Sequence, residues 1–435
     1  MDGNALTSSH DVIVIGAGIA GFAAASALKR RGKNVAVVAA NFGATSVSSG
    51  AWDFGPLSPR LRASLEEVRR GESWSEIYSQ VLVDAATFGG ATELSTAAIE
   101  VAGDLAPDLK VAFDFQRGFT IPTSAGRLKR TFGAQELQTR ASVTRLKGKR
   151  VALVAGENWR FRPDLLIRRW QAEAALLGEK LDIAPLWIHL KESGPDWPLP
   201  SLAARYHADA GFRERFREVV LERLHGSSFE ALLFPPFFLE PKHADELGRD
   251  LHIEIGEMLS TVEPVAGYRL RRAIQSSLVR QGIPVQLLSQ LQAETQDGRV
   301  VRLRGYEPTR GWRDLEGKHF VLATGKYFGG GIKLGLEIIS EPLFDLPLFR
   351  GKEGREVRYR TEISWADREF REEQTWAAIG LRVDEKWRPL DRNRAPVLSN
   401  LSACGGIIGG VDPARSRLGL GLLAYMGREN GKRAS

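Results

Sequence analysis

The sequence contains a single cysteine, Cys404, among its 435 residues. One cysteine excludes a disulfide within the chain, and it excludes an iron–sulfur cluster held by four thiolates of this chain. Such sparse cysteine usage is typical of proteins from a reducing compartment. We therefore expect a cytoplasmic protein, and we expect Cys404 to be a small buried residue without a chemical role.

Long apolar runs are also scarce. One uncharged stretch, residues 12–28, is interrupted by three glycines and followed by Lys29, Arg30 and Arg31. A secretory signal carries its positive charges before the apolar run, not after it. We interpret these residues as a strand, a turn and a buried helix, and we expect no direct membrane span because no other segment is long and apolar enough.

Acidic residues are fewer than basic residues, 53 against 60, which gives a formal net charge of +7. Basic faces attract nucleic acid, anionic membranes or phosphorylated substrates, although most are simply solvated. The sequence has no motif of interleaved basic and aromatic residues that would stack on bases. We therefore expect no nucleic-acid partner, and a small phosphorylated substrate fits the charge.

A complete G-x-G-x-x-G motif occupies residues 16–21. It follows a short β-branched run at residues 11–15 and precedes an alanine-rich helical segment at residues 22–31. In that setting the first glycine makes a tight turn, the second lets a pyrophosphate approach, and the third lets the helix pack on the strand. The amides at the helix N-terminus then face the phosphates. The predicted cofactor-binding residues of this turn are Gly16, Gly18, Ile19, Ala20 and Gly21.

The acidic side chain that normally follows the second strand of such a unit is missing. The chain there reads Ala39, Ala40, Asn41. Without a carboxylate on the ribose hydroxyls, either Asn41 or backbone groups bind the adenosine, or adenosine binding is loose, which leaves FMN as an alternative to FAD. Ser48, Ser49 and Gly50 follow and offer hydroxyls and amides to the cofactor. Residues 41–53 contain no histidine or cysteine, so we expect non-covalent binding.

Two segments near the other end of the chain have the same glycine-rich character. Ala323, Thr324 and Gly325 follow an apolar strand, and small residues there would let the chain pass close to the cofactor. Residues 400–413 lead from a strand through Gly409 and Gly410 to Asp412. A helix starting around Gly419 would direct its N-terminus at the flavin pyrimidine and stabilise negative charge on the reduced ring.

These segments predict an α/β fold with a Rossmann-like FAD/NAD(P)-binding domain built from both chain ends. We assign residues 10–75 and 265–435 to this discontinuous domain. The residues between them differ in texture, with charged helical segments and short buried strands. We assign residues 76–264 to an inserted α/β cap domain that would face the substrate.

Several of these motifs together resemble one family. Ser48 to Gly50 with Asp53, the segment VLATGKYFGGGI at residues 321–332, residues 380–389 and the NLSACGGIIGGVDP segment are similar to the B-type subunit of anaerobic glycerol-3-phosphate dehydrogenase. That family belongs to the fumarate reductase-like class of FAD-dependent oxidoreductases. The resemblance covers both ends of the chain well and its middle loosely.

The resemblance implies oxidation of sn-glycerol 3-phosphate to dihydroxyacetone phosphate, with electrons passed to quinone. It further implies two partners, a second flavoprotein subunit and an iron–sulfur subunit that anchors the complex to the membrane. The chain would then be cytoplasmic and peripheral at the inner face of the membrane. One segment departs from the family: residues 414–423, ARSRLGLGLL, replace a run of glycines and small residues. The departure favours an alternative, a non-catalytic flavin-binding scaffold or electron-relay subunit of a redox complex.

The catalytic base is not identifiable from the sequence. None of the seven histidines stands in a recognisable catalytic motif, and the sequence indicates no metal site. Oxidation of a phosphorylated alcohol needs cations for the phosphate. The candidates are Arg127, Lys129 and Arg130, which lie close together, and Lys326 after the Ala-Thr-Gly turn. Solvated basic clusters are more common than phosphate sites.

Overall fold

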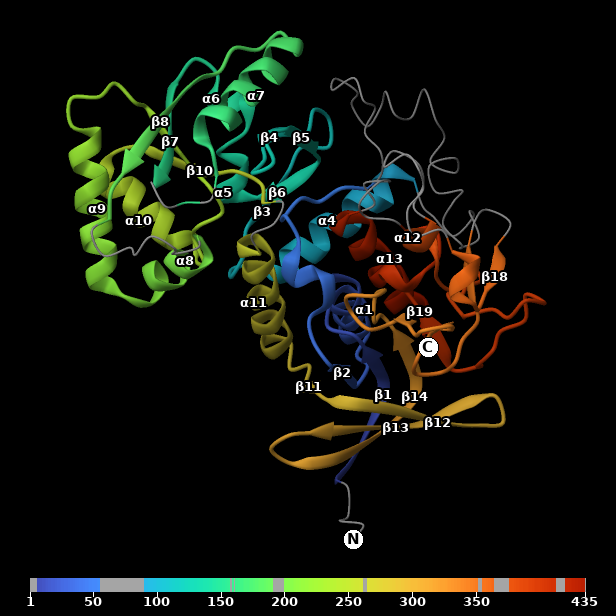
Figure 1. The fold of residues 1–435 in the computed structure, drawn as a ribbon. Coiled ribbons are helices and arrows are strands. Elements are labelled where there is room, and N and C mark those ends of the chain that lie inside the picture. Colours follow the sequence, from blue (N-terminus) through green and yellow to red (C-terminus); the bar gives the residue numbers. More distant parts are fainter. Residues whose placement is uncertain are drawn as a thin grey trace.

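The structure is a computed structural model that describes residues 6–54, 90–156, 159, 161–190, 199–260, 264–350, 354–363, 375–411 and 419–434. Its two chain ends gather in one unit, and the middle of the chain forms a second unit beside it (Figure 1). Among the described residues, no helix combines the length and the apolar character needed to cross a membrane. The expected α/β fold, with a nucleotide-binding unit built from both ends of the chain, is confirmed.

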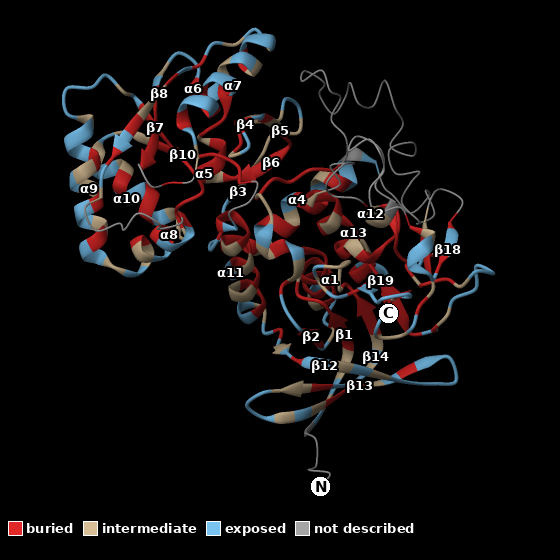
Figure 2. Ribbon diagram, in the orientation of Figure 1, coloured by how far each residue is buried: buried red, intermediate tan, exposed pale blue. Residues whose placement is uncertain are grey.

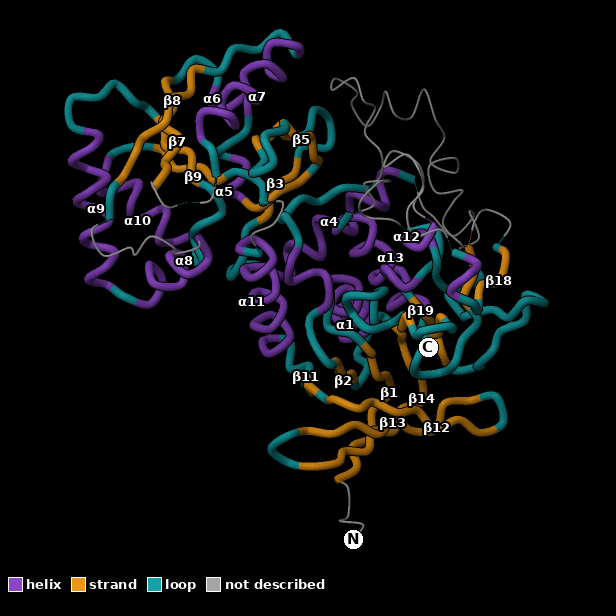
Figure 3. Tube along the Cα trace, viewed as in Figure 1, coloured by secondary structure: helices purple, strands orange, loops and turns teal. Residues whose placement is uncertain are grey.

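The first unit is organised around a seven-stranded sheet of order β11-β2-β1-β14-β13-β12, with β19 pairing β14. Strands β11, β2, β1, β14 and β19 are parallel along their contacts, whereas β12 and β13 form an antiparallel extension (Figure 3). The elements of this unit are β1 (Leu6–Ile15), α1 (Ile19–Arg30), β2 (Val35–Ala39), η1 (Gly43–Val47), α4 (Ala91–Leu105), α11 (Val265–Arg280), β11 (Val285–Leu287), β12 (Ser289–Gln296), β13 (Arg299–Glu307), β14 (Gly311–Leu322), β15 (Lys333–Leu334), β16 (Ile339–Ser340), β17 (Leu348–Arg350), β18 (Arg355–Val357), η3 (Arg360–Glu362), α12 (Thr375–Ala378), β19 (Leu401–Ala403), η4 (Gly405–Ile407) and α13 (Leu420–Arg433).

The register of this sheet places the ends of three strands together. Ile15 at the end of β1 is aligned with Leu322 at the end of β14 and with Val38 in β2. Parallel strands that end in register bring the loops that follow them to one edge of the sheet, which is where doubly wound folds bind their ligands. The residues after β1, β2 and β14 therefore meet there.

Helix α1 is buried between the sheet and α13, and its alanine-rich sequence makes this possible. Ten of its residues, 19–28, are buried (Figure 2). A Cβ added to Gly427 of α13 would lie 2.0 Å from the carbonyl oxygen of Ala20, so this glycine lets the two helices touch. The prediction of a helix starting around residue 419 is confirmed, because α13 begins at Leu420 with Gly419 as its N-cap.

The second unit contains a four-stranded parallel sheet of order β10-β9-β7-β8 and two small antiparallel ribbons, β3 with β6 and β4 with β5. Its core includes a cluster of aromatic rings, among them Tyr206, Phe216 and Phe237. Its elements are β3 (Val111–Phe113), β4 (Phe119–Pro122), β5 (Leu128–Thr131), β6 (Gly133–Gln135), α5 (Glu136–Thr139), α6 (Val143–Leu146), β7 (Arg150–Gly156), α7 (Pro163–Leu176), β8 (Asp182–Ile188), α8 (Leu199–Ala208), α9 (Ala210–Leu224), β9 (Ala231–Phe234), α10 (Pro241–Leu251) and β10 (Glu254–Glu257).

The limits assigned to the two domains stay predictions. The boundary at residue 75 falls outside the described residues. Helix α4 follows that boundary, yet Leu94, Ala98 and Val101 belong to the same hydrophobic core as the strands of the first sheet. The boundary at residue 265 coincides with the first residue of α11.

Gly103 lies in the last turn of α4 and is exposed, and a Cβ added there would meet no atom within 4 Å. We expect Gly103→Ala to raise the free energy of unfolding by about 0.5–1 kcal/mol, because alanine loses less backbone entropy than glycine in a helix. Urea unfolding of the two proteins measures the difference. A destabilised variant would contradict the helical assignment at this position.

Candidate functional site

The turn between β1 and α1 has the geometry that its glycines predict. Gly16 has φ +122°, and a Cβ added to it would lie 2.3 Å from the carbonyl oxygen of Ala323. A Cβ added to Gly21 would lie 1.9 Å from the carbonyl oxygen of Gly16. The two glycines therefore allow the turn to contact both the first helix turn and the end of β14, so three predicted cofactor residues meet here.

Gly18 is the N-cap of α1 and differs from its neighbours. Its φ of −73° suits any residue, and an added Cβ would find the Thr45 hydroxyl at 3.1 Å as its nearest atom. Thr45 is buried, and its Oγ1 accepts a hydrogen bond of 2.9 Å from the amide of Ile19. A hydroxyl that accepts one bond still has a proton to donate, which suits a phosphate oxygen at this helix terminus.

The sequence pattern did not single out Thr45. The only signal for it is a hydroxyl residue in the loop after the second strand, three residues before Ser48. Asn41, which was predicted to replace the missing acid, is exposed, and its Oδ1 accepts a hydrogen bond of 2.7 Å from the amide of Gly43. A ribose contact by Asn41 stays a prediction.

Two predicted cofactor residues carry buried hydroxyls that have no hydrogen-bond partner in the described part of the chain. They are Ser48 in the loop after β2 and Thr324 in the turn after β14. Buried polar atoms are usually satisfied, so each unpaired hydroxyl is available to a bound group. Next to Ser48, the carbonyl of Ser49 accepts a hydrogen bond of 2.8 Å from Gln138, and Gly50 has φ +87°. These residues therefore fit a polar cofactor such as FAD.

The glycine-rich segment near the C-terminus approaches the same edge. A Cβ added to Gly405 would lie 2.5 Å from the Cβ of Ala20, and one added to Gly406 would lie 3.7 Å from the Cα of Gly325. The amides of Gly409 and Gly410 donate instead to the carbonyls of Leu381 and Ala378, at 2.9 and 2.7 Å. Those two amides are thus bound within the protein, and a direct cofactor contact by either glycine stays a prediction. Asp412 lies outside the described residues.

The N-terminus of α13 contacts the loop that contains Asp53. The amide of Leu422 donates to the carbonyl of Asp53 at 3.2 Å, and the Asp53 side chain is buried. One carboxylate oxygen of Asp53 forms an ion pair of 2.7 Å with Lys129, and the other is buried without a partner among the described residues. The helix terminus therefore points toward residues 50–54, which follow the predicted cofactor loop.

The four cations proposed for a substrate phosphate do not gather at one point. Arg127 pairs with Glu173, Lys129 pairs with Asp53, and Arg130 donates to the carbonyl of Arg117. The Lys326 ammonium donates to the carbonyls of Ala377 and, at 2.6 Å, Val411. Each cation thus has a structural contact, and a phosphate-binding role for any of them stays a prediction.

A charged cavity of about 370 Å³ lies where α11 meets α5 and α10. Its lining charges are paired: Arg140 binds Asp245 at 2.6 Å, and Arg272 binds Glu240 at 2.9 Å. Gln135, also in the wall, donates to the carbonyl of Ala266 at 2.8 Å. The next residue, Gly267, packs against residues 46–48, so one turn of α11 separates the cavity wall from the cofactor loop.

His319 belongs to a polar network inside the first unit. Its Nε2 lies 3.0 Å from Ser402 Oγ, and that hydroxyl donates to Asn430 Oδ1 at 3.1 Å. Burial, with a smaller effect from the positive charge of Arg299, lowers the pKa of His319 from 6.5 to about 4. The imidazole is therefore neutral at neutral pH, and its role is structural.

We expect this histidine to make the fold sensitive to acid. The unfolded chain takes up a proton on His319 below about pH 6.5, whereas the folded chain does so only near pH 4, so stability falls as the pH drops through that window. The loss would reach about 3 kcal/mol. His319→Gln keeps a donor for Ser402 and should flatten this component in urea unfolding across the window. An equal pH dependence in both proteins would contradict the assignment.

Two families of flavoproteins match the two ends of the chain. Residues 11–181 match a profile described as FAD dependent oxidoreductase, and residues 291–422 match one described as FAD binding domain. Both matches indicate FAD as the cofactor, as the first turn predicts. They cover the two chain segments from which the predicted cofactor residues come.

Two relatives align along nearly the whole chain. The B-type subunit of anaerobic glycerol-3-phosphate dehydrogenase from Haemophilus ducreyi is 22% identical over 411 residues, 92% of this chain and 93% of the relative. The protein of the same name from Yersinia pseudotuberculosis is 26% identical over 437 residues, 95% of each chain. Among solved structures, 3-ketosteroid delta1-dehydrogenase from Sterolibacterium denitrificans aligns over 98% of both chains with 12% identity and a TM-score of 0.43. The chain is a flavin-dependent oxidoreductase related to the B-type subunit of anaerobic glycerol-3-phosphate dehydrogenase.

Proposed function

We propose that this chain is the flavin-binding subunit of a dehydrogenase that oxidises sn-glycerol 3-phosphate to dihydroxyacetone phosphate. The observation that carries the proposal is similarity along 92–95% of the chain to proteins that are named for this activity. An alignment of that extent includes the first turn, the middle of the chain and the C-terminal glycine segment. The electrons pass through partner subunits to quinone.

Residues of this chain would hold the cofactor at the shared edge of the first sheet. The amide of Ile19 and the Thr45 hydroxyl would face the diphosphate, and the unpaired hydroxyls of Ser48 and Thr324 would bind polar groups of the cofactor. Bound FAD supplies an acceptor for the two electrons released from the alcohol. Bonds to buried hydroxyls that lack partners would favour the loaded state.

Partner subunits are needed because this chain has no route of its own for electrons beyond the flavin. Its one thiol, Cys404, is buried, and burial raises its pKa to about 12, so it is neither a redox thiol nor a cluster ligand. We infer an iron–sulfur subunit that anchors the complex at the membrane, and a second flavoprotein subunit. Both are inferred from the chemistry that this chain lacks and from its relatives, which are named as subunits of a larger enzyme.

Anaerobic spectroscopy tests this function. The purified chain, alone and assembled with its partners, is expected to show flavin absorption that sn-glycerol 3-phosphate bleaches and a quinone restores. Glycerol without phosphate serves as the control and should leave the absorption unchanged. A flavin that is bound in the complete complex and is not reduced by sn-glycerol 3-phosphate would refute the dehydrogenase.

A second candidate is a flavin-binding scaffold or electron-relay subunit without its own substrate. The observation that favours it is the pairing of Arg127, Lys129, Arg130 and Lys326 within the protein, which leaves these predicted phosphate ligands occupied. The relay predicts that the flavin is reduced only through the partner flavoprotein. Adding substrate to this chain alone and then to the complex separates the two functions.

A further inference from the structure

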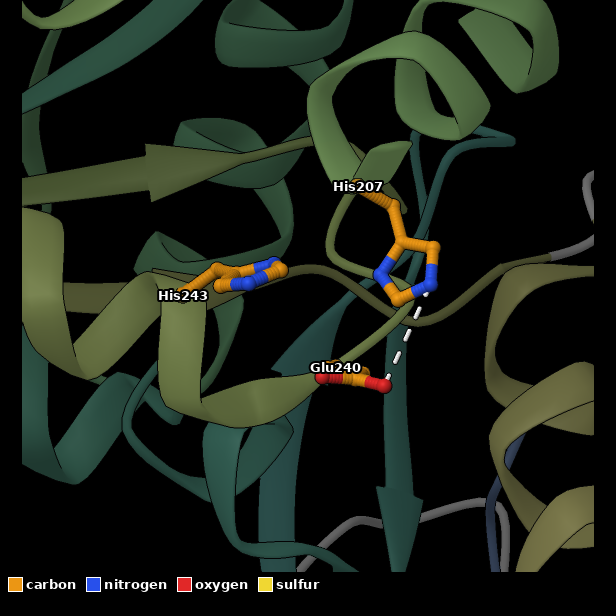
Figure 4. Close-up of side chains that lie close together, drawn as sticks. All are labelled: His207, Glu240 and His243. Atoms are coloured by element: carbon orange, nitrogen blue, oxygen red, sulfur yellow. Dashed lines mark ion pairs between the residues drawn. The ribbon is translucent and has the colours of Figure 1, made fainter. Parts of the chain in front are cut away.

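Three potential metal ligands meet in the second unit, away from the predicted cofactor residues. His207 lies in the last turn of α8, Glu240 is the N-cap of α10, and His243 lies in the first turn of α10. One nitrogen of each histidine and one carboxylate oxygen of Glu240 lie within 4.8 Å of one another. Figure 4 shows the two rings and the carboxylate directed toward a common space.

The local sequence explains why these side chains face each other. Pro241 starts α10 directly after Glu240, and His243 follows three residues after Glu240, so the two side chains project from the same face of the first helical turn. Tyr206 packs edge-on against Phe238 and His243, at ring-centroid distances of 5.7 and 6.0 Å. This packing holds the end of α8 over the start of α10 and brings His207 into reach.

The imidazoles show a need for a ligand. His243 is 6% exposed, and its Nδ1 is buried without a hydrogen-bond partner among the described residues. The Nδ1 of His207 is in the same condition. A buried polar atom without a partner costs about 1–3 kcal/mol, and such atoms are rare in native proteins. Two of them in adjacent rings, beside a carboxylate, indicate a missing bound group.

The ligand set fits a divalent transition metal. Two imidazole nitrogens and one carboxylate are ligands of zinc sites that keep an open position for water, and imidazole also suits copper, nickel and iron. His207 Nε2 lies 3.9 Å from Glu240 Oε1. Tetrahedral Zn²⁺ with bonds of about 2.0–2.1 Å places its ligand atoms about 3.3 Å apart. Small side-chain rotations would therefore close the site.

Two cations compete with a metal ion for Glu240. Lys242 binds its Oε2 at 2.6 Å, and Arg272 of α11 binds its Oε1 at 2.9 Å. Burial would raise the pKa of Glu240, but hydrogen bonds from Lys242 and Arg272 bring it to about 2, so the carboxylate is charged. The Lys242 side chain is 64% exposed and can turn into solvent. Glu240 also lines the cavity of about 370 Å³, which gives an ion access.

We propose that His207, Glu240 and His243 form a binding site for one divalent transition-metal ion of the Zn²⁺ type, completed by water from the cavity. The ion joins α8 to α10. It also draws the Glu240 carboxylate away from Arg272, which weakens an ion pair between the second unit and α11. Local sequence patterns do not reveal this site, because His207 and the Glu240-x-x-His243 pair are separated by more than thirty residues.

The test uses the complete chain with its FAD, purified without a polyhistidine tag and treated with a chelator. Zn²⁺ is titrated in a calorimeter, and bound metal is counted by elemental analysis after gel filtration. We expect one ion per chain and a higher melting temperature with Zn²⁺. The absence of saturable binding, or a stoichiometry that reflects several weak surface sites, would overturn the proposal.

Variants locate the ion. His207→Gln and Glu240→Gln should each weaken Zn²⁺ binding at least about 100-fold, since loss of an outer-shell partner alone typically costs 10–100-fold. Lys242→Met removes a competing cation and should tighten binding. His225→Gln is the matched control, because His225 is an exposed histidine just after α9. Equal affinity in wild type, His207→Gln and Glu240→Gln would refute the site, as would a loss in His225→Gln of the same size.

Discussion

Replacing Arg269 with methionine is expected to lower the free energy of unfolding by about 3–5 kcal/mol, the usual cost of removing one partner from a buried ion pair. Arg269 of α11 and Glu257 of β10 have side chains that are 2% and 0% exposed, and they pair at 2.5 Å. The guanidinium also donates to Gln135 Oε1 at 2.6 Å and to the carbonyl of Phe238 at 2.5 Å. Methionine fills similar space but satisfies none of these acceptors.

The carboxylate of Glu257 makes the loss severe. It accepts hydrogen bonds from the amides of Phe237 and Phe238, at 2.7 and 3.1 Å, which fix its position in the core. Without Arg269 it is a buried charge that has lost its counter-ion. Because the network joins α11 to both β10 and β6, the variant should also loosen the helix turn that packs against residues 46–48 of the cofactor loop.

Urea unfolding with saturating FAD measures this effect. Arg272→Met is the matched control, since Arg272 lies one turn further along α11 and pairs with Glu240 while its side chain is 44% exposed. An exposed pair of that kind contributes about 0–1 kcal/mol. In a double-mutant cycle, Arg269→Met with Glu257→Gln should cost less than the sum of the two single changes. Similar losses in Arg269→Met and Arg272→Met would contradict the buried pair.

The nucleotide-binding unit could be predicted because its signals are local. The spacing of Gly16, Gly18 and Gly21 between a β-branched run and an alanine-rich segment specifies one strand–turn–helix geometry. The hairpin turn at Asp297-Gly298 is a similar case: both residues have positive φ, and the turn joins β12 to β13 as expected. In each example, residues a few positions apart determine the backbone between them.

The basic cluster illustrates why side-chain roles were harder to predict. Lys129 and Arg130 are adjacent on β5, and successive side chains of a strand point to opposite faces. Lys129 accordingly reaches Asp53, whereas Arg130 turns into the second unit toward the carbonyl of Arg117. Adjacency in the sequence therefore does not place two cations around one ligand. The contact of Thr45 with the α1 terminus has the opposite problem, because it depends on how a loop folds back over a distant turn.

Gly18→Val is expected to yield a folded protein that binds FAD at least about 100-fold more weakly, a loss of about 3 kcal/mol. Gly18 has a φ that valine adopts readily, and the nearest atom to its Cβ would be the hydroxyl of a side chain, so the backbone is not obstructed. A diphosphate must approach this residue to reach the amides of the first helix turn. A side chain there occupies the path of the phosphates and spares the fold, apart from about 1 kcal/mol for a poorer N-cap.

Three glycine substitutions separate cofactor binding from folding. Gly18→Ala should give an intermediate affinity for FAD in fluorescence titrations, because its single methyl group intrudes less than a valine side chain. Gly103→Ala should bind FAD as tightly as the wild type does. Gly21→Ala should fail to fold, because its Cβ would lie 1.9 Å from the carbonyl oxygen of Gly16. If Gly18→Val kept a native circular dichroism spectrum together with wild-type FAD affinity, the diphosphate could not lie at this turn, and the cofactor would have to enter the sheet edge from the side of Thr324 and Gly325.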